Sequence, residues 1–336
     1  MHRAVRACFL FGSLSVAWLT TGPARGETCP PLQLLDQIRM VPVNNATTML
    51  IPVTINGADK FMIFDTGASA NSLTRALANE LGLSVHPSLR PSPLFDAYGD
   101  VSHDVTTVRD FKFGRQDVRD ALFKIWPNPD LENADARLAG VLSLDQLLQF
   151  DIDVDFPGGV LKLFSPDHCE GKILYWNAAA IAVSDFDTRG RHLNIVATLD
   201  GQKLNAIIDS GAAYSILSAD AARHFFGLTP DSSEMRQSAT LTKNAQYPVY
   251  QHPFAELNFN GVAVSKPVIA IWPDMSRTMD RSLQDTHNRA IPMRAGANPP
   301  QLIIGMDILS KLHIYIASRE RRIYFSGASE GSLPLK

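Results

Sequence analysis

Two short motifs of similar composition lie 144 residues apart and supply a pair of carboxylates. The first is Asp-Thr-Gly-Ala at 65–68, and the second is Asp-Ser-Gly-Ala at 209–212. Each motif follows an apolar run, at 62–64 and 206–208, that is typical of a buried strand. A strand that ends at the Asp holds the carboxylate on a rigid element. The two motifs are therefore candidates for one shared site.

The residues after each Asp have separate expected roles. Thr66 and Ser210 carry hydroxyls that can bond backbone groups across an interface between the two halves. Gly67 and Gly211 allow a sharp turn because glycine has no Cβ. One such motif alone is typical of an Asx turn at the end of a strand. Two copies at matching points of a repeat favour a catalytic pair.

The two carboxylates could perform acid–base chemistry on a water molecule. If a pseudo-twofold axis relates the halves, Asp65 and Asp209 meet at the axis. Two carboxylates a few ångström apart cannot both ionise cheaply, so they share one proton. The ionised carboxylate can then take a proton from water, while the protonated one supports negative charge that develops on a carbonyl oxygen. This chemistry predicts no metal and no cofactor.

An internal repeat surrounds both motifs. Apolar runs flank Asn-Gly at 56–57 in the first copy and Asp-Gly at 200–201 in the second, which predicts a β-hairpin before each Asp. Later segments also correspond: 80–83 with 225–228, 111–114 with 257–261, 125–127 with 271–273, and 141–145 with 303–307. The spacing jumps only before the last pair. We therefore expect a surface loop inserted at 275–300 in the second copy.

Short β-branched and aromatic runs dominate both copies, and few helices are expected. We predict helices near 73–81, 144–150, 219–226 and 306–312, and closing strands at 152–156, 160–164, 314–316 and 323–325. The sequence thus predicts a mostly β protein of two similar, barrel-like lobes. The expected division is a first lobe at 27–170 and a second lobe at 171–336, after a segment at 1–26 that is removed.

The first 26 residues have the features of a secretory signal peptide. Basic residues at 2, 3 and 6 precede an apolar run at 7–19 and small residues at 24–26. This run is shorter than the ~20 residues of a spanning helix, so we expect no membrane span and an exported protein, periplasmic or secreted. Lys and Arg number 31 against 34 Asp and Glu, which argues against nucleic acid as a partner.

Two cysteines, Cys29 and Cys169, remain after the expected cleavage. In an exported protein such a pair predicts a disulfide, here one that closes the first lobe. The alternative is two buried free thiols. None of the nine histidines falls in a metal-ligand spacing.

The chain resembles the two-lobed, retropepsin-like aspartic peptidases of the exported bacterial type. The resemblance rests on both Asp motifs and on the closing Ile303-Ile304-Gly305, and it covers nearly all of 27–336. It implies an acid-protease fold, Asp65 and Asp209 as the catalytic pair, and a cleft that binds a peptide or protein substrate in extended form. The expected activity is that of an aspartic endopeptidase, active as a monomer.

The family also implies a β-hairpin flap over the cleft. Residues 91–104, with Tyr98 and Gly99 as its tip, lie at the corresponding place, although an ordinary proline-rich loop is the alternative. Two other functions are compatible with the same cleft. One is a peptide-binding protein without catalysis, and the other is a narrowly specific processing peptidase. Both Asp motifs are intact, which favours catalysis.

Three departures from the family pattern carry expectations. Ser143 stands where the closing signature of the first lobe usually has Gly, which leaves open how closely this strand packs beside Asp65. Ala68 and Ala212 replace hydroxyl residues that stabilise the ionised form, so we expect an optimum at about pH 5–6 instead of about pH 2. About twenty residues precede the first core strand, too few for a pepsin-like inhibitory segment.

Overall fold

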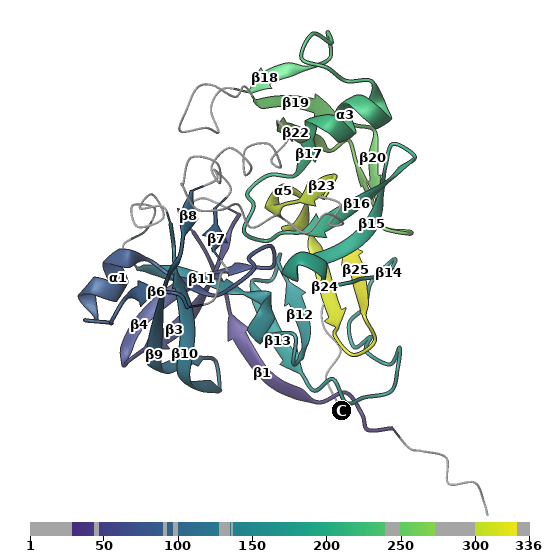
Figure 1. Ribbon diagram of the computed structural model, residues 1–336. Coiled ribbons are helices and arrows are strands. Elements are labelled where there is room, and N and C mark those ends of the chain that lie inside the picture. The colour runs from purple at the N-terminus through teal and green to yellow at the C-terminus, as the bar shows by residue number, and fades with distance from the viewer. Residues whose placement is uncertain are drawn as a thin grey trace, which may run out of the picture.

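A computed structural model describes residues 29–43, 47–89, 93–96, 100–127, 135, 137–238, 249–272 and 300–327. Within these ranges the chain is mostly β, and its two lobes are related by a pseudo-twofold, as the sequence predicts (Figure 1). The segment at 1–26, the residues Tyr98 and Gly99, and all but Pro300 of the expected insertion lie outside the described residues.

An eight-stranded sheet forms the first lobe, in the order β2-β3-β4-β11-β5-β10-β9-β6. β3 pairs with β9 as well as with β4, which closes the sheet into a barrel-like shape. The Asn56-Gly57 turn has positive φ at both residues, as a tight hairpin requires. The strands are β2 (Val41–Pro42), β3 (Met49–Ile55), β4 (Ala58–Asp65), β5 (Ser72–Leu73), β6 (His86–Pro87), β9 (Asp104–Phe113), β10 (Gln116–Ile125) and β11 (Leu138–Ser143).

A nine-stranded sheet forms the second lobe, in the order β18-β19-β22-β17-β23-β16-β15-β20-β21. Its hairpin turns at Asp200-Gly201, again with positive φ at both residues. The strands are β15 (Leu193–Leu199), β16 (Gln202–Ile208), β17 (Ile216–Ser218), β18 (Arg236–Ser238), β19 (Val249–Pro253), β20 (Glu256–Asn258), β21 (Ala263–Ser265), β22 (Val268–Trp272) and β23 (Leu302–Ile304).

A third sheet combines strands from both halves of the chain, in the order β1-β13-β12-β24-β25-β14. β12 pairs with β24 in antiparallel fashion, and Figure 1 shows these strands where the two lobes meet. The strands are β1 (Leu34–Arg39), β12 (Asp151–Asp155), β13 (Val160–Phe164), β14 (Ala182–Asp185), β24 (Leu312–Ala317) and β25 (Arg322–Gly327). Because this sheet belongs to both halves, the division at 170 and 171 stays a prediction.

Helices are short, and three of the four expected ones are shorter than predicted. α1 (Arg75–Glu80) begins after Thr74, whose hydroxyl accepts a hydrogen bond from Leu77 N at 3.2 Å. The expected helix at 144–150 is a 3₁₀ turn, η1 (Leu144–Gln146). α5 (Met306–Leu309) ends early because β24 begins at Leu312, whereas α3 (Ala219–Phe226) matches its prediction. A second 3₁₀ turn, η2 (Arg189–Arg191), precedes β15.

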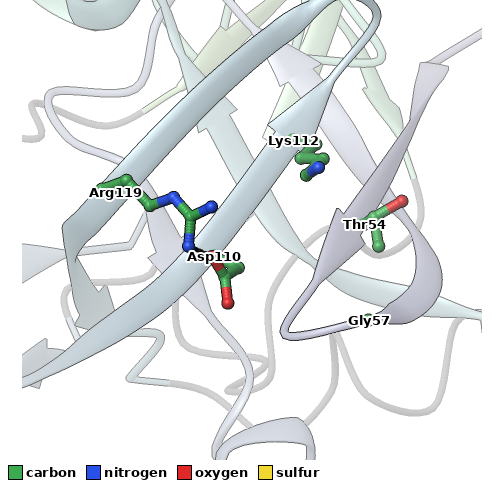
Figure 2. Close-up of a pocket in the computed structure, with 5 residues that line it drawn as sticks. All are labelled: Thr54, Gly57, Asp110, Lys112 and Arg119. Atoms are coloured by element: carbon green, nitrogen blue, oxygen red, sulfur yellow. Dashed lines mark hydrogen bonds and ion pairs between the residues drawn. The ribbon is translucent and has the colours of Figure 1, made fainter.

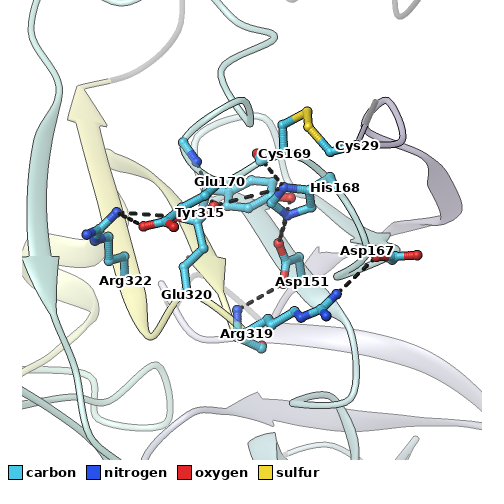
Figure 3. A network of polar contacts seen from close by, with 12 residues as sticks. Cys29, Asp151, Asp167, His168, Cys169, Glu170, Tyr315, Arg319, Glu320 and Arg322 are labelled. Carbon is cyan, nitrogen blue, oxygen red and sulfur yellow. Dashed lines mark hydrogen bonds and ion pairs between the residues drawn. A yellow bond between two sulfur atoms is a disulfide. The ribbon is translucent and has the colours of Figure 1, made fainter. Parts of the chain in front are cut away.

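A disulfide joins Cys29 to Cys169, with their Cα atoms 5.2 Å apart, so the expected pairing is present. Figure 3 shows it beside His168, whose Nε2 lies 2.6 Å from Oδ2 of Asp151 in β12. Tyr315 in β24 donates to the same carboxylate oxygen at 3.2 Å. Buried polar contacts therefore connect the disulfide region of the first half to the last strands of the second half.

Candidate active site

Asp65 and Asp209 lie against each other at the junction of the lobes. Asp65 is the last residue of β4, and Asp209 directly follows β16. Each strand lies between its hairpin partner and a parallel closing strand, β11 or β23. The ladder runs up to the acids, since Ser143 pairs with Asp65, and Asp209 N donates to Ile304 O at 3.0 Å. The buried sheets thus fix both carboxylates.

Glycine is required after each acid because the two motifs cross closely. A Cβ on Gly67 would lie 2.3 Å from Cγ of Asp209, and a Cβ on Gly211 would lie 2.3 Å from Cγ of Asp65. Real Cβ atoms do not approach so closely, so any side chain at either position would displace the opposite carboxylate. The reciprocal contacts place the two acids at one site.

Four hydrogen bonds lock the loops together, and all of them are buried. Thr66 Oγ1 donates to Ile208 O at 2.8 Å and accepts from Ser210 N at 3.0 Å. Ser210 Oγ donates to Phe64 O at 2.7 Å and accepts from Thr66 N at 3.0 Å. Each hydroxyl therefore bonds backbone groups of the opposite lobe, as expected from the sequence. This arrangement fixes the separation of the acids.

Both acids accept two backbone N–H groups in the same way. Oδ1 of Asp65 accepts from Gly67 N and Ala68 N, each at 2.8 Å. Oδ1 of Asp209 accepts from Gly211 N at 2.9 Å and from Ala212 N at 3.1 Å. These donors favour the ionised form of each carboxyl.

Burial shifts the pKa of both acids. Burial raises the pKa of Asp65 well above its usual value, and the negative charge of Asp209 raises it further. Burial also raises the pKa of Asp209, but the N–H donors of Ala212 and Gly211 and a hydrogen bond with Asp65 oppose the rise. The N–H donors of Gly67 and Ala68 oppose the rise at Asp65 in the same way, and the pair therefore holds one proton between its two carboxyls.

Asn71 supports the loop of the first lobe. Its Oδ1 accepts from Ser143 N at 2.8 Å and from Ser143 Oγ at 2.9 Å, so the unusual Ser143 is fully bonded and buried. In the second lobe the equivalent of Asn71 is Ser215, whose Oγ accepts from Gly305 N at 3.0 Å. The shorter serine fits with Gly305 because a Cβ there would lie 2.5 Å from the backbone of Tyr214.

Arg191 is a second contributor that sequence analysis missed. Its guanidinium donates to Ser69 O at 3.0 Å and lies 3.0 Å from Oδ2 of Asp145. Both contacts reach from η2 of the second lobe to the first lobe. No motif marks such a pair, because Arg191 and Asp145 are 46 positions apart in the chain. The internal repeat could have identified Asn71, because it lies 144 positions before Ser215, the same spacing as that of the two acids.

Two short strands within the expected flap at 91–104 pair with each other. β7 (Leu94–Phe95) pairs with β8 (Val101–Ser102) in antiparallel fashion. Tyr98 and Gly99 lie outside the described residues, so the flap stays a prediction. A pocket of about 370 Å³ elsewhere on this lobe is lined by Thr54, Gly57, Asp110, Lys112 and Arg119 (Figure 2). Gly57 precedes β4, at the opposite end from Asp65, so this pocket is separate from the acid pair.

Two further findings concern the parts of the chain that the structure describes. Within these parts no group of three His, Cys, Asp or Glu side chains is arranged to hold a metal ion. None of the helices described there has the length and apolar character needed to cross a membrane.

Family models match both halves of the chain. Residues 51–143 match the model described as "gag-polyprotein putative aspartyl protease", and residues 195–308 match the model described as "Aspartyl protease". Both lobes are similar to aspartyl protease domains. Each matched range contains one Asp motif and its closing strand, so both acids lie in segments that are similar to aspartyl proteases.

Two solved structures are similar to this chain at very low sequence identity. The aspartic proteinase from Irpex lacteus is 8% identical, with a TM-score of 0.50, over 87% of this chain and 97% of that one. The crystal structure of edgp is 9% identical, with a TM-score of 0.46, over 87% of this chain and 94% of that one. No curated protein is significantly similar in sequence. The aspartic proteinase neighbour supports the two-lobed acid-protease fold.

Proposed function

We propose that this protein is an aspartic endopeptidase that hydrolyses peptide bonds with Asp65 and Asp209. The observation that carries the proposal is the reciprocal contact of the two acids, each packed against the glycine that follows the other. Such packing places one proton between two carboxyls at a lobe junction. The substrate is a peptide or protein segment bound in extended form between the lobes.

The mechanism uses the asymmetry of the pair. Asp209, ionised, accepts a proton from a water molecule that lies between the acids, and the resulting hydroxide attacks the peptide carbonyl carbon. Asp65 donates its proton to the carbonyl oxygen, which gives a neutral tetrahedral diol. Asp209 then passes its proton to the leaving nitrogen, and Asp65 recovers a proton as the diol collapses to the carboxylic acid. No step needs a metal or a cofactor.

The cellular setting is part of the proposal. The signal-like segment at 1–26 and the disulfide of Cys29 and Cys169 are both consistent with an exported protein, in the periplasm or secreted. Both acids come from one chain, so a monomer is sufficient for catalysis. The bacterial exported type of aspartic peptidase combines these features.

Cleavage of an unfolded protein tests the proposal. Residues 27–336 are incubated with the substrate between about pH 3 and 8, with Asp65→Asn in parallel and the half-exposed Asp117→Asn as the matched control. We expect cleavage by the wild type and by Asp117→Asn, and none by Asp65→Asn. If folded wild type cuts nothing, a peptide-binding protein or a narrowly specific processing peptidase replaces the proposal. Cleavage by Asp65→Asn would rule out this mechanism.

A further inference from the structure

Which carboxyl is ionised is not determined by the motif loops themselves. The loops are near copies, and each acid accepts two backbone N–H groups at 2.8–3.1 Å. An asymmetric pair therefore needs an asymmetric neighbour. The question rests on the proposed function, because the ionised acid is the base of the reaction.

The internal repeat places different residues opposite the two acids. In the second lobe the antiparallel ladder ends where Leu193 pairs with Ile208, and His192 and Asp209 are the next residues on its two strands. In the first lobe the ladder ends at Leu50 and Ile63, and the same register continued by two positions leads to Thr48 and Asp65. Thr48 and His192 are 144 positions apart, as are the two acids. Thr48 cannot carry a charge, whereas the imidazole of His192 can.

The backbone of His192 is held firmly beside the site. Asn194 Nδ2 donates to His192 O at 3.0 Å and to Arg189 O at 2.8 Å, and it also reaches Oδ1 of Asp187 at 3.1 Å. The ring nitrogen Nδ1 of His192 is buried and makes no hydrogen bond within the part of the chain that the structure describes. The imidazole is thus positioned by the turn, and its own polar group is not used in fixing the fold.

Other charges near this turn are already paired. Arg189 lies 2.6 Å from Oδ2 of Asp187, and Arg191 lies 3.0 Å from Oδ2 of Asp145. Lys124 lies close enough to Arg191 for the two charges to repel, which adds to the effect of burial in lowering the pKa of Lys124. The side chains of Asp65 and His192 both influence the charge of Asp209. A positive charge on His192 lowers the pKa of Asp209, in opposition to burial.

We infer that His192, when protonated, assigns the negative charge of the pair to Asp209 and leaves the shared proton on Asp65. His192 is a positioning residue, since it acts through Asp209. The break in the repeat at 48 and 192 thus gives two similar lobes different chemical roles. Asp209 becomes the base that receives the proton of water, and Asp65 becomes the acid that faces the carbonyl oxygen.

The test replaces His192 with its counterpart in the first lobe. His192→Thr copies Thr48, and His192→Gln keeps a polar side chain of similar size. The matched control is His252→Thr, because His252 in β19 also has a buried Nδ1 without a partner among the described residues. Circular dichroism checks folding, and His192→Gln replaces His192→Thr if the latter does not fold.

The first readout is a pH titration of the carboxyl carbons by ¹³C NMR, with Asp209 assigned through Asp209→Asn. We expect the apparent pKa of Asp209 to rise by about half a unit to one unit in His192→Thr and to stay unchanged in His252→Thr. An unchanged Asp209 titration in both His192 variants would overturn the inference. This readout needs no turnover, so it decides the inference even if the wild type cleaves nothing and the proposed function fails.

The second readout is the pH profile of kcat/KM. The acid limb reports protonation of the ionised carboxyl, so His192→Thr should move this limb to higher pH by about the same amount. The value of kcat/KM at pH 4 should then fall about three- to tenfold relative to the optimum. A loss that is equal at every pH would indicate a merely structural role and would contradict the inference.

Discussion

The hydroxyl of Thr66 offers a direct test of how the lobes are held together. It donates to Ile208 O and accepts from Ser210 N, and its side chain is 2% exposed. Thr66→Val keeps the shape of the side chain but removes the hydroxyl. A buried carbonyl and a buried N–H of the second lobe then lose their partner.

The expected loss of stability follows from the two backbone groups, Ile208 O and Ser210 N, that lose their hydrogen-bond partner. Each unsatisfied buried backbone group costs about 1–3 kcal/mol, so Thr66→Val should lower the free energy of unfolding by about 2–6 kcal/mol. Little of this comes from a cavity, because valine and threonine are similar in volume. Activity should fall further than stability explains, since a shift of about 1 Å in catalytic groups can cost about 100-fold in rate.

Urea unfolding followed by tryptophan fluorescence measures the change. The matched control is Thr54→Val, whose exposed hydroxyl donates to Asp59 Oδ1 at 2.9 Å and should contribute less than about 0.5 kcal/mol. Ser210→Ala and the double variant complete a cycle, in which the two effects should be less than additive because the hydroxyls belong to one network. If Thr66→Val unfolds within about 0.5 kcal/mol of the wild type, the buried network does not hold the lobes, and the reasoning fails.

Three further predictions concern the glycines, the disulfide and the buried histidine. Gly67→Ala should fold but lose at least about 100-fold in kcat, while Gly327→Ala, where a Cβ meets nothing within 4 Å, should keep its activity; an active Gly67→Ala would contradict the crossing of the motifs. Cys29→Ser with Cys169→Ser opens a loop of 140 residues and should cost about 4–5 kcal/mol in the chain-entropy model, as thermal unfolding would measure; an unchanged Tm would refute this. Burial opposes the charge of His168, but its pKa is raised because Cys169 O and Asp151 bond the protonated ring. The contribution of this charge to stability is therefore complete below the unfolded pKa of 6.5 and is lost as pH rises through the folded pKa. Urea unfolding between about pH 6 and 8 should show this fall in the wild type and less of it in His168→Asn, and equal slopes would contradict the prediction.

Local patterns were sufficient to predict much of the fold. The Asn56-Gly57 and Asp200-Gly201 turns, with their alternating flanks, predicted both hairpins that end at the acids. The repeat predicted two similar lobes, because one supersecondary pattern occurs twice. The helix predicted near 144–150 is present but shorter, as the 3₁₀ turn at Leu144–Gln146.

Several contacts between distant segments were not predictable from patterns. β1 and β14 lie at the edges of the six-stranded sheet, and neither strand belongs to the repeat. The bond of Asn71 to Ser143 and the ion pair of Arg191 with Asp145 depend on tertiary packing. The role inferred for His192 depends on the β15–β16 ladder, which ends next to His192 and Asp209. Sequence spacing alone shows which residues correspond between the lobes, not which residues touch.

The pH dependence of kcat/KM on one short peptide tests the central claim most directly. If Asp65 and Asp209 share one proton, activity requires one ionised and one protonated carboxyl, and the profile is bell-shaped. With Ala68 and Ala212 in place of hydroxyl residues, the account predicts a maximum at about pH 5–6 and no activity in Asp209→Asn at any pH. A profile with a single limb, a maximum below about pH 3, or cleavage by Asp209→Asn would contradict it.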